Sequence, residues 1–152
     1  MQVRLLSPSW VAIIRRHAYP VTCGVLFAPL LVAWTWKLLE PYPLPETVEA
    51  AFSFSGTARF IAAKTLHASV YSALAWLVTV GAPTRRWWFA GLGLLVAHAA
   101  GTEIAQHLMA VGRTGKVTDV LIDLAGISLG VLVAQVLSAE RIGRWLTRPA
   151  RA

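Results

Sequence analysis

The chain has 152 residues, of which 57% are hydrophobic and only 14% are charged, and its formal net charge is +7. A soluble domain usually carries about 25% charged residues, because a small globule has a large surface to keep hydrated, so this composition argues against a soluble domain and favours a membrane protein. The basic residues stand in short clusters between long apolar segments, as at Arg85 and Arg86, which argues against a continuous phosphate-binding stripe for nucleic acid.

Four apolar segments each approach the roughly 20 residues that a helix needs to cross the hydrocarbon core. The first covers 21–39, follows Pro20 and ends at the Pro-rich stretch that begins with Glu40. The second begins at residue 59 or 60 and ends at Gly81, the third begins at residue 87 or 88 and ends at Val111, and the fourth covers 118–138. We therefore predict an all-α, polytopic membrane bundle of about four transmembrane helices.

The remaining segments are assigned by their composition. Residues 8–14 predict a short separate interfacial helix, and residues 40–58, with three prolines, predict an ordered interfacial connection. Trp34 and Trp36 are interpreted as interfacial anchors and Cys23 as a small buried hydrophobic residue. No repeat or change of composition divides the chain, so we predict one domain over residues 1–152 with its core at about 60–133.

The basic residues predict the orientation in the membrane. Nine arginines fall on the side that holds both termini and the loop between the second and third segments: Arg4, Arg15, Arg16, Arg85, Arg86, Arg141, Arg144, Arg148 and Arg151. The other side holds Arg59, Arg113 and Lys116. Because cytoplasmic loops are enriched in basic residues, we predict cytoplasmic N- and C-termini and a multi-pass location in the bacterial inner membrane.

Polar and ionisable residues inside the apolar segments give the main indication of function, because they are expensive in lipid. In the second segment they lie along one stripe of the helix. In the fourth segment the two acidic residues share a stripe with two glycines that are spaced for close helix packing. The residues are Lys64, His67 and Tyr71 in the second segment, Glu103 and Gln106 in the third, and Asp119, Asp123, Gly126 and Gly130 in the fourth.

These side chains are predicted to share one depth. With a rise of 1.5 Å per residue, Lys64 and His67 lie roughly 6–10 Å from the outer end of the second helix, while Glu103 lies about 12 Å and Asp123 about 7 Å from the outer ends of theirs. Arg113 is predicted just above this depth. We expect these charges to pair, for example Lys64 or Arg113 with a carboxylate from the third or fourth helix.

The order of these motifs resembles the VanZ-like membrane proteins over roughly residues 60–133. That family is characterised by Lys-x-x-His-x-x-x-Tyr, here Lys64 to Tyr71, by Glu-x-x-Gln, here Glu103 to Gln106, and by an Arg followed by an Asp motif and glycines. The chain has Ala63 where the family often has Asp, and Asp123 where it often has Asn. The resemblance implies a cell-envelope setting, because the family takes its name from a protein linked to glycopeptide-antibiotic resistance.

Three functional hypotheses follow. The first is binding of an anionic lipid-linked or glycopeptide-related ligand in the polar layer, with Lys64, Arg113 and His67 holding a phosphate; a structural ion-pair network that fixes helix register is the alternative reading of the same residues. The second is a non-catalytic accessory subunit or assembly factor of a larger membrane complex. The third is a small intramembrane enzyme with His67 and Glu103 as acid and base.

The predicted partners are membrane lipids, a lipid-linked envelope ligand, and a membrane-protein partner or a second copy of the chain, but not nucleic acid. His98 and His107 lie on one helix, but their spacing of nine residues is not that of a metal-ligand pair. We therefore predict no metal and no cofactor. The sequence favours a binding protein over an enzyme and does not settle the question.

Overall fold

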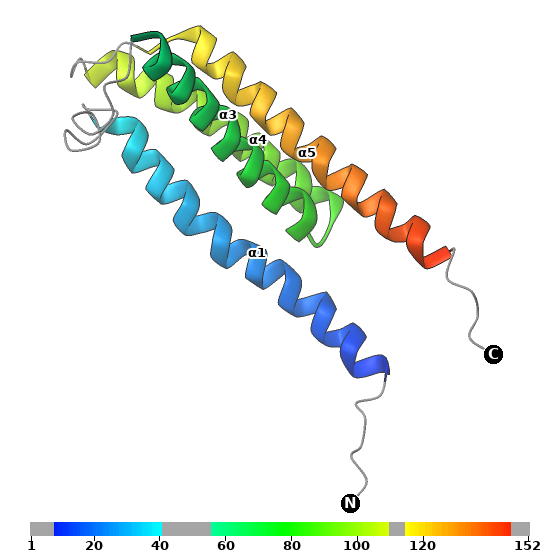
Figure 1. The fold of residues 1–152 in the computed structure, drawn as a ribbon. Coiled ribbons are helices and arrows are strands. Elements are labelled where there is room, and N and C mark those ends of the chain that lie inside the picture. Colours follow the sequence, from blue (N-terminus) through cyan, green and yellow to red (C-terminus); the bar gives the residue numbers. More distant parts are fainter. Residues whose placement is uncertain (1–7, 41–55, 110–114, 147–152) are drawn as a thin grey trace, which may run out of the picture.

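The computed structural model of the chain describes residues 8–40, 56–109 and 115–146, with side chains described for 19–40, 56–109 and 115–138. Within these ranges it contains no strand and four α-helices: α1 (Pro8–Leu39), α3 (Gly56–Gly81), α4 (Arg85–Met109) and α5 (Val117–Leu146) (Figure 1). Each helix includes an apolar stretch long enough to cross a membrane. The predicted all-α membrane bundle is confirmed.

The first helix differs from the prediction. We expected a separate interfacial helix over residues 8–14 and a membrane helix that follows Pro20, but α1 is continuous from Pro8 to Leu39 and contains both Pro20 and Pro29. A proline in a helix interior removes a backbone donor and breaks many soluble helices. In an apolar segment, however, a break would expose more backbone groups to lipid, so the helix continues through both prolines.

The other helices begin and end close to the predicted positions. Helix α3 begins at Gly56, earlier than predicted, and ends at Gly81, while α5 begins at Val117 and extends to Leu146, beyond the predicted end. A turn over residues 82–84 connects α3 to α4, and the Thr84 carbonyl accepts a 3.1 Å hydrogen bond from the Trp88 amide. Most of the predicted interfacial connection (41–55) and the segment 110–114 lie outside the described residues.

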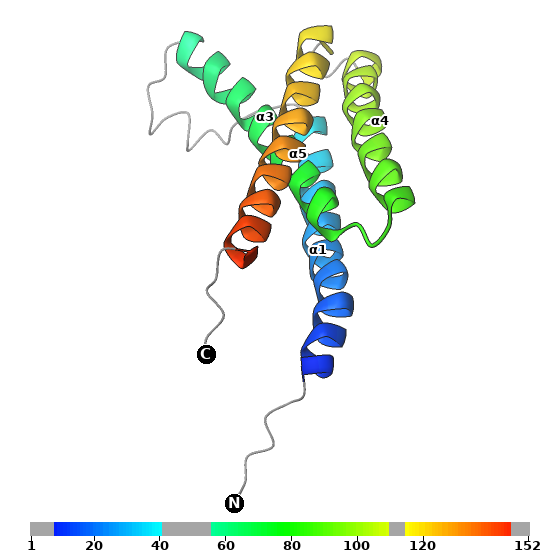
Figure 2. The same ribbon diagram turned by 90° about the vertical axis from the view of Figure 1, so that its right-hand side faces the viewer.

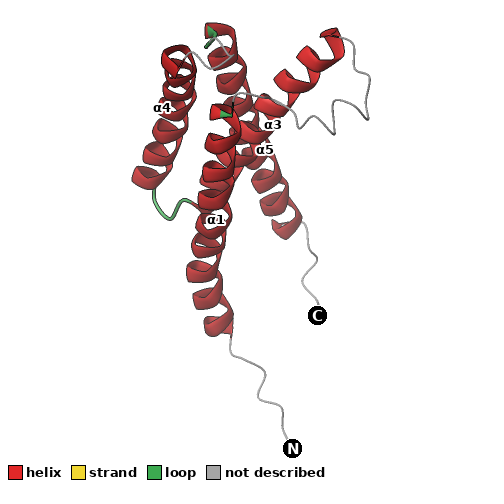
Figure 3. Cartoon of the chain, turned by 90° about the vertical axis from the view of Figure 1, so that its left-hand side faces the viewer, coloured by secondary structure: helices red, strands yellow, loops and turns green. Residues whose placement is uncertain are grey.

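Helix α3 is the centre of the bundle, because it makes the two most extensive helix–helix contacts, first with α5 and then with α1. Figure 2 shows α3 and α5 crossing, and Figure 3 shows α1 on the opposite side with α4 beside it. At the crossing a Cβ atom added to Gly126 would meet the Ala68 carbonyl oxygen, and one added to Gly130 would meet the Ser72 carbonyl oxygen. The two glycines thus leave room for the backbones of α3 and α5 to approach closely.

The two ends of the bundle are distinct. The turn at 82–84 lies toward the same end as the beginning of α1 and the end of α5, and we call this the turn end (Figures 1 and 2). The opposite end holds the beginnings of α3 and α5 and the ends of α1 and α4, and we call it the layer end. This agrees with the relative arrangement that the basic clusters predict, while the compartment that each end faces stays a prediction.

The core between the ends is small and apolar. It contains Trp34, Leu38, Tyr71, Leu74, Ala75, Leu95, Ala99 and Ile127. Many large apolar side chains lie on the outer surface instead; Val32 is 69% exposed and Leu121 60%. Such a surface suits contact with lipid acyl chains, which need no burial of apolar groups against protein.

Candidate functional site

A group of polar side chains lies between the helices toward the layer end, and we call it the polar layer. Because α3 and α5 begin at this end and α4 ends there, residues far apart in the sequence reach one depth. Thr35, in α1, joins it through a hydrogen bond. The layer consists of Lys64, His67 and Tyr71 from α3, His98, Thr102, Glu103 and Gln106 from α4, and Asp119 and Asp123 from α5.

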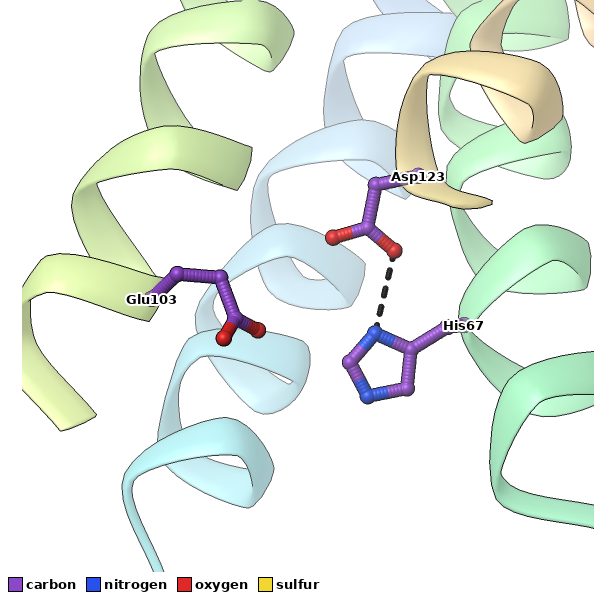
Figure 4. Close-up of side chains that lie close together, drawn as sticks. All are labelled: His67, Glu103 and Asp123. Carbon is purple, nitrogen blue, oxygen red and sulfur yellow. Dashed lines mark hydrogen bonds and ion pairs between the residues drawn. The ribbon is translucent and has the colours of Figure 1, made fainter. Parts of the chain in front are cut away.

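Three ionisable residues on three helices form the centre of the layer. The Nδ1 atom of His67 lies 3.0 Å from Oδ1 of Asp123, within hydrogen-bonding distance, and Glu103 faces this pair from α4 (Figure 4). One potential metal-binding atom from each of the three residues lies within 4.8 Å of the other two. Asp123 is fully buried, and His67 and Glu103 are 5% and 6% exposed. We call these residues the His67–Glu103–Asp123 triad.

The triad carboxylates are only partly hydrogen-bonded. Glu103 Oε2 accepts a 2.6 Å hydrogen bond from the backbone amide of Lys116. The other oxygens, Glu103 Oε1 and Asp123 Oδ2, are buried and have no hydrogen-bond partner among the residues that the structure describes. A buried polar atom without a partner typically costs about 1–3 kcal/mol, and more when it is charged. Such oxygens are therefore not explained by stability alone.

Lys64 pairs differently from the prediction. We expected it to pair with Glu103 or Asp123, but its Nζ atom forms an ion pair with Oδ1 of Asp119. The two side chains are 17% and 14% exposed, so the pair lies at the rim of the layer. Asp119 and Asp123 are one helical turn apart on α5, and the rotation of the helix brings the outer carboxylate to Lys64 and the inner one to His67. The predicted partner Arg113 lies outside the described residues.

A chain of hydrogen bonds closes the inner side of the layer. The Thr35 hydroxyl donates to the Leu31 carbonyl over 2.7 Å, so its oxygen must accept from Nε2 of His98, which lies 2.8 Å away. This places the His98 proton on Nε2, and Nδ1 then accepts a hydrogen bond from the Tyr71 hydroxyl, also over 2.8 Å. Both ring nitrogens of His98 are thus engaged. His107, the other histidine of α4, is exposed and lies outside the layer.

Trp34 of α1 packs against the layer. The predicted role of Trp34 as an interfacial anchor is wrong, because Trp34 is only 6% exposed and its ring packs edge-on against His67 with 5.2 Å between ring centroids. Trp36, in contrast, is 73% exposed, as an anchor would be. Gln106 donates a 2.7 Å hydrogen bond to the Leu38 carbonyl and so connects α4 to α1. Cys23 is buried as predicted.

The sequence did not predict Trp34 or Thr35 beside the polar layer, nor the contact between His98 and Tyr71. A signal for Trp34 exists: Leu30, Trp34 and Leu38 recur every four residues, which indicates one helix face. Of these, Trp34 and Leu38 are buried in the core and Leu30 packs against it. No comparable signal exists for Thr35, because its role depends on a side chain 63 positions away in the sequence.

Comparison with known proteins supports the resemblance on which the sequence analysis relied. A family model described as VanZ/LLP1 matches residues 27–138. The chain belongs to the VanZ/LLP1 family. The match includes every residue of the polar layer. No curated protein and no solved structure matches the chain.

Proposed function

We propose that this VanZ/LLP1 family protein binds the phosphate-bearing headgroup of an anionic lipid or lipid-linked envelope ligand in its polar layer. The observation that carries the proposal is the convergence of ionisable side chains from three helices inside an apolar bundle. In a membrane such residues are expensive, and they commonly mark a path or a site for a ligand.

The charges at the rim of the layer favour a phosphate. The Lys64 side chain is 17% exposed, so its ammonium group can exchange Asp119 for a ligand oxygen. The beginnings of α3 and α5 lie at the same end, and the N-terminus of a helix attracts anions. Arg59 and Lys116 are exposed near these helix ends. A headgroup at the layer end would therefore meet positive charge first and the buried carboxylates behind it.

We further propose that the layer end faces the periplasm and the turn end the cytoplasm, with the protein in the bacterial inner membrane. Arg85 and Arg86, which directly follow the turn, support this orientation. A ligand would then reach the polar layer from the outer leaflet, where lipid-linked envelope intermediates and glycopeptide-related molecules are exposed.

The test compares lipid that co-purifies with the wild-type protein and with Lys64→Ala. We expect at least a tenfold lower occupancy of phosphate-bearing lipid in Lys64→Ala and a loss in Arg113→Ala, measured by native mass spectrometry and phosphate analysis of extracts. Lys37→Ala is the matched control, because Lys37 pairs with Glu40 over 2.5 Å toward the same end of the bundle but outside the layer.

The melting temperature of each variant is measured in parallel, so that a loss of lipid is read only in folded protein. Equal phosphate-bearing lipid in the wild type, Lys64→Ala and Lys37→Ala would contradict the proposal.

A second candidate, a small intramembrane enzyme, is favoured by one specific observation. The hydrogen bond between His67 and Asp123, with Glu103 on the other side, is an arrangement that acid–base catalysis uses. The same extracts separate the two candidates: intact ligand supports binding, whereas cleaved or transferred headgroups that disappear in Glu103→Gln support catalysis.

A further inference from the structure

We propose that the His67–Glu103–Asp123 triad binds a divalent ion of a first-row transition metal, of the Zn²⁺ or Mn²⁺ kind. This goes beyond the proposed headgroup binding, and it stands whether or not a lipid binds at the rim of the layer. It also revises our expectation from the sequence, which considered only His98 and His107 for a metal and predicted none.

The geometry of the triad is the first argument. Zn²⁺ binds nitrogen and oxygen ligands at about 2.0–2.2 Å, so two ligand atoms on one ion lie about 3–4 Å apart. One atom from each triad residue already lies within 4.8 Å of the other two. A side-chain movement of about 1 Å or less, within the reach of small rotamer adjustments, would bring the three atoms to a common ion.

The unsatisfied oxygens are the second, independent argument. Glu103 Oε1 and Asp123 Oδ2 belong to side chains that are more than nine-tenths buried, and neither has a hydrogen-bond partner within the described part of the chain. Figure 4 shows both carboxylates turned toward the space between the three side chains. A bound cation would satisfy both oxygens at once, whereas a single neutral donor would leave their charges uncompensated.

Charge balance is the third argument. At the rim, the positive charge of Lys64 compensates the negative charge of Asp119. The two triad carboxylates carry two further negative charges, and a divalent ion beside a neutral His67 compensates both. With the ion bound, the described side chains of the polar layer are electrically neutral, which is the state that a bundle surrounded by lipid favours.

Neighbouring residues hold the triad side chains in place. The Lys116 amide fixes one oxygen of Glu103 and leaves the other for a ligand, while the Trp34 ring packs against the His67 imidazole. Such outer contacts orient metal ligands in known sites. His98 is excluded as a fourth ligand because both its nitrogens are engaged. One imidazole with two carboxylates favours Zn²⁺ or Mn²⁺ over Mg²⁺, which retains water and prefers oxygen ligands.

The test uses the full chain, purified through a tag without histidines, delipidated and stripped with a chelator. We titrate it with Zn²⁺ and Mn²⁺, and with Mg²⁺ for comparison, and determine bound metal by mass spectrometry after gel filtration. We expect about one Zn²⁺ or Mn²⁺ per chain and a higher melting temperature with metal. In known metal sites, the loss of a residue that only supports a ligand weakens metal binding about tenfold or more. Removing a ligand itself should weaken binding by at least as much.

Two of the three ligand variants have a matched control. Glu103→Gln is compared with Glu40→Gln, and His67→Gln with the exposed His107→Gln, because both controls lie outside the polar layer. Asp123→Asn completes the set. Loss of metal in the three ligand variants with retention in both controls supports the site. Equal metal content in the wild type and Glu103→Gln, or equal loss in Glu40→Gln, overturns it.

A measurement on the wild type alone guards against variants that do not fold. Co²⁺, used in place of Zn²⁺, gives visible absorption bands that report nitrogen and oxygen ligands in a site of low coordination number. If the protein with Co²⁺ shows no spectrum other than that of aqueous Co²⁺, the proposal is overturned. The outcomes also separate the two proposals: lipid binding without metal overturns this inference alone, and metal binding without lipid overturns only the proposed headgroup binding.

Discussion

The two ends of the bundle use the same helices in opposite ways. At the turn end α3 packs against α1 and α4 through small and apolar side chains: Gly81 lies against Cys23, and Gly91 lies against Val78. An apolar groove there is lined by Pro20, Cys23, Phe27, Leu77, Val78 and Trp87, among others. At the layer end α3, α4 and α5 bury an imidazole and two carboxylates.

The difference lies in what the side chains at each end require. Apolar contacts at the turn end and in the core need no partner beyond good packing. Ionisable side chains at the layer end need either complete pairing or a ligand, and Glu103 and Asp123 are incompletely paired within the described residues. A membrane bundle gains nothing in stability from such groups. We therefore expect substitutions at the two ends to affect different properties.

The largest expected difference between the two ends is whether a reagent outside intact cells can reach them. In a Cys23→Ala background, a cysteine introduced at Lys116 should react with a membrane-impermeant thiol reagent in intact cells, because Lys116 is exposed at the layer end. A cysteine at Pro83, exposed in the turn, should react only after the cells are broken. Reaction at Pro83 in intact cells would reverse the orientation that we propose.

The next largest effect is on stability. Leu95 is completely buried in the core, and Leu95→Ala should lower the free energy of unfolding by about 2–5 kcal/mol through the cavity that it creates. Glu103→Gln should change it by only about 1 kcal/mol or less, while it should weaken metal binding at least tenfold. Denaturant titration in detergent measures both, with the half-exposed Leu94→Ala as control. If Glu103→Gln were the more destabilising variant, the polar layer would be structural.

The smallest effect concerns the contact between α3 and α5. Gly130→Ala places a methyl group against the Ser72 carbonyl and should destabilise the protein by about 1–3 kcal/mol, because a backbone atom cannot move aside easily. Gly91→Ala meets a Val78 side-chain carbon at 2.7 Å, which can rotate, so its effect should be smaller. Gly93→Ala meets nothing within 4 Å and should be neutral or stabilising by up to about 1 kcal/mol. Melting temperatures of the three variants test this order.

The fold could be predicted largely from the sequence, because the length of an apolar segment alone determines whether it spans a membrane. The predicted break of α1 at Pro20 was wrong because of the same lipid surroundings. Proline ends soluble helices, and the prediction transferred that rule to a segment in which lipid leaves the backbone no alternative hydrogen-bond partner. The sharing of one depth by His67, Glu103 and Asp123 followed from the rise per residue alone.

The pairing of these residues could not be predicted, because it depends on how each helix is rotated about its axis. The rise per residue gives the depth of a side chain but not this rotation. A rotation of α5 decides whether Lys64 meets Asp119 or Asp123, and the structure selects Asp119. The same limitation hid Trp34, since a tryptophan near a helix end suits both an interface and a core. The metal-compatible arrangement of the triad also became visible only from the relative rotation of three helices.

The hydrogen-bond chain on the inner side of the polar layer has a consequence for the movement of protons. It runs in one direction, from the Tyr71 hydroxyl through His98 to Thr35, and it terminates at the Leu31 carbonyl, a group with no exchangeable hydrogen. Proton transfer along a chain of hydrogen bonds requires every group to be both a donor and an acceptor, and the Leu31 carbonyl can only accept. The hydrogen bonds therefore give a proton no continuous path beyond Thr35 along this route.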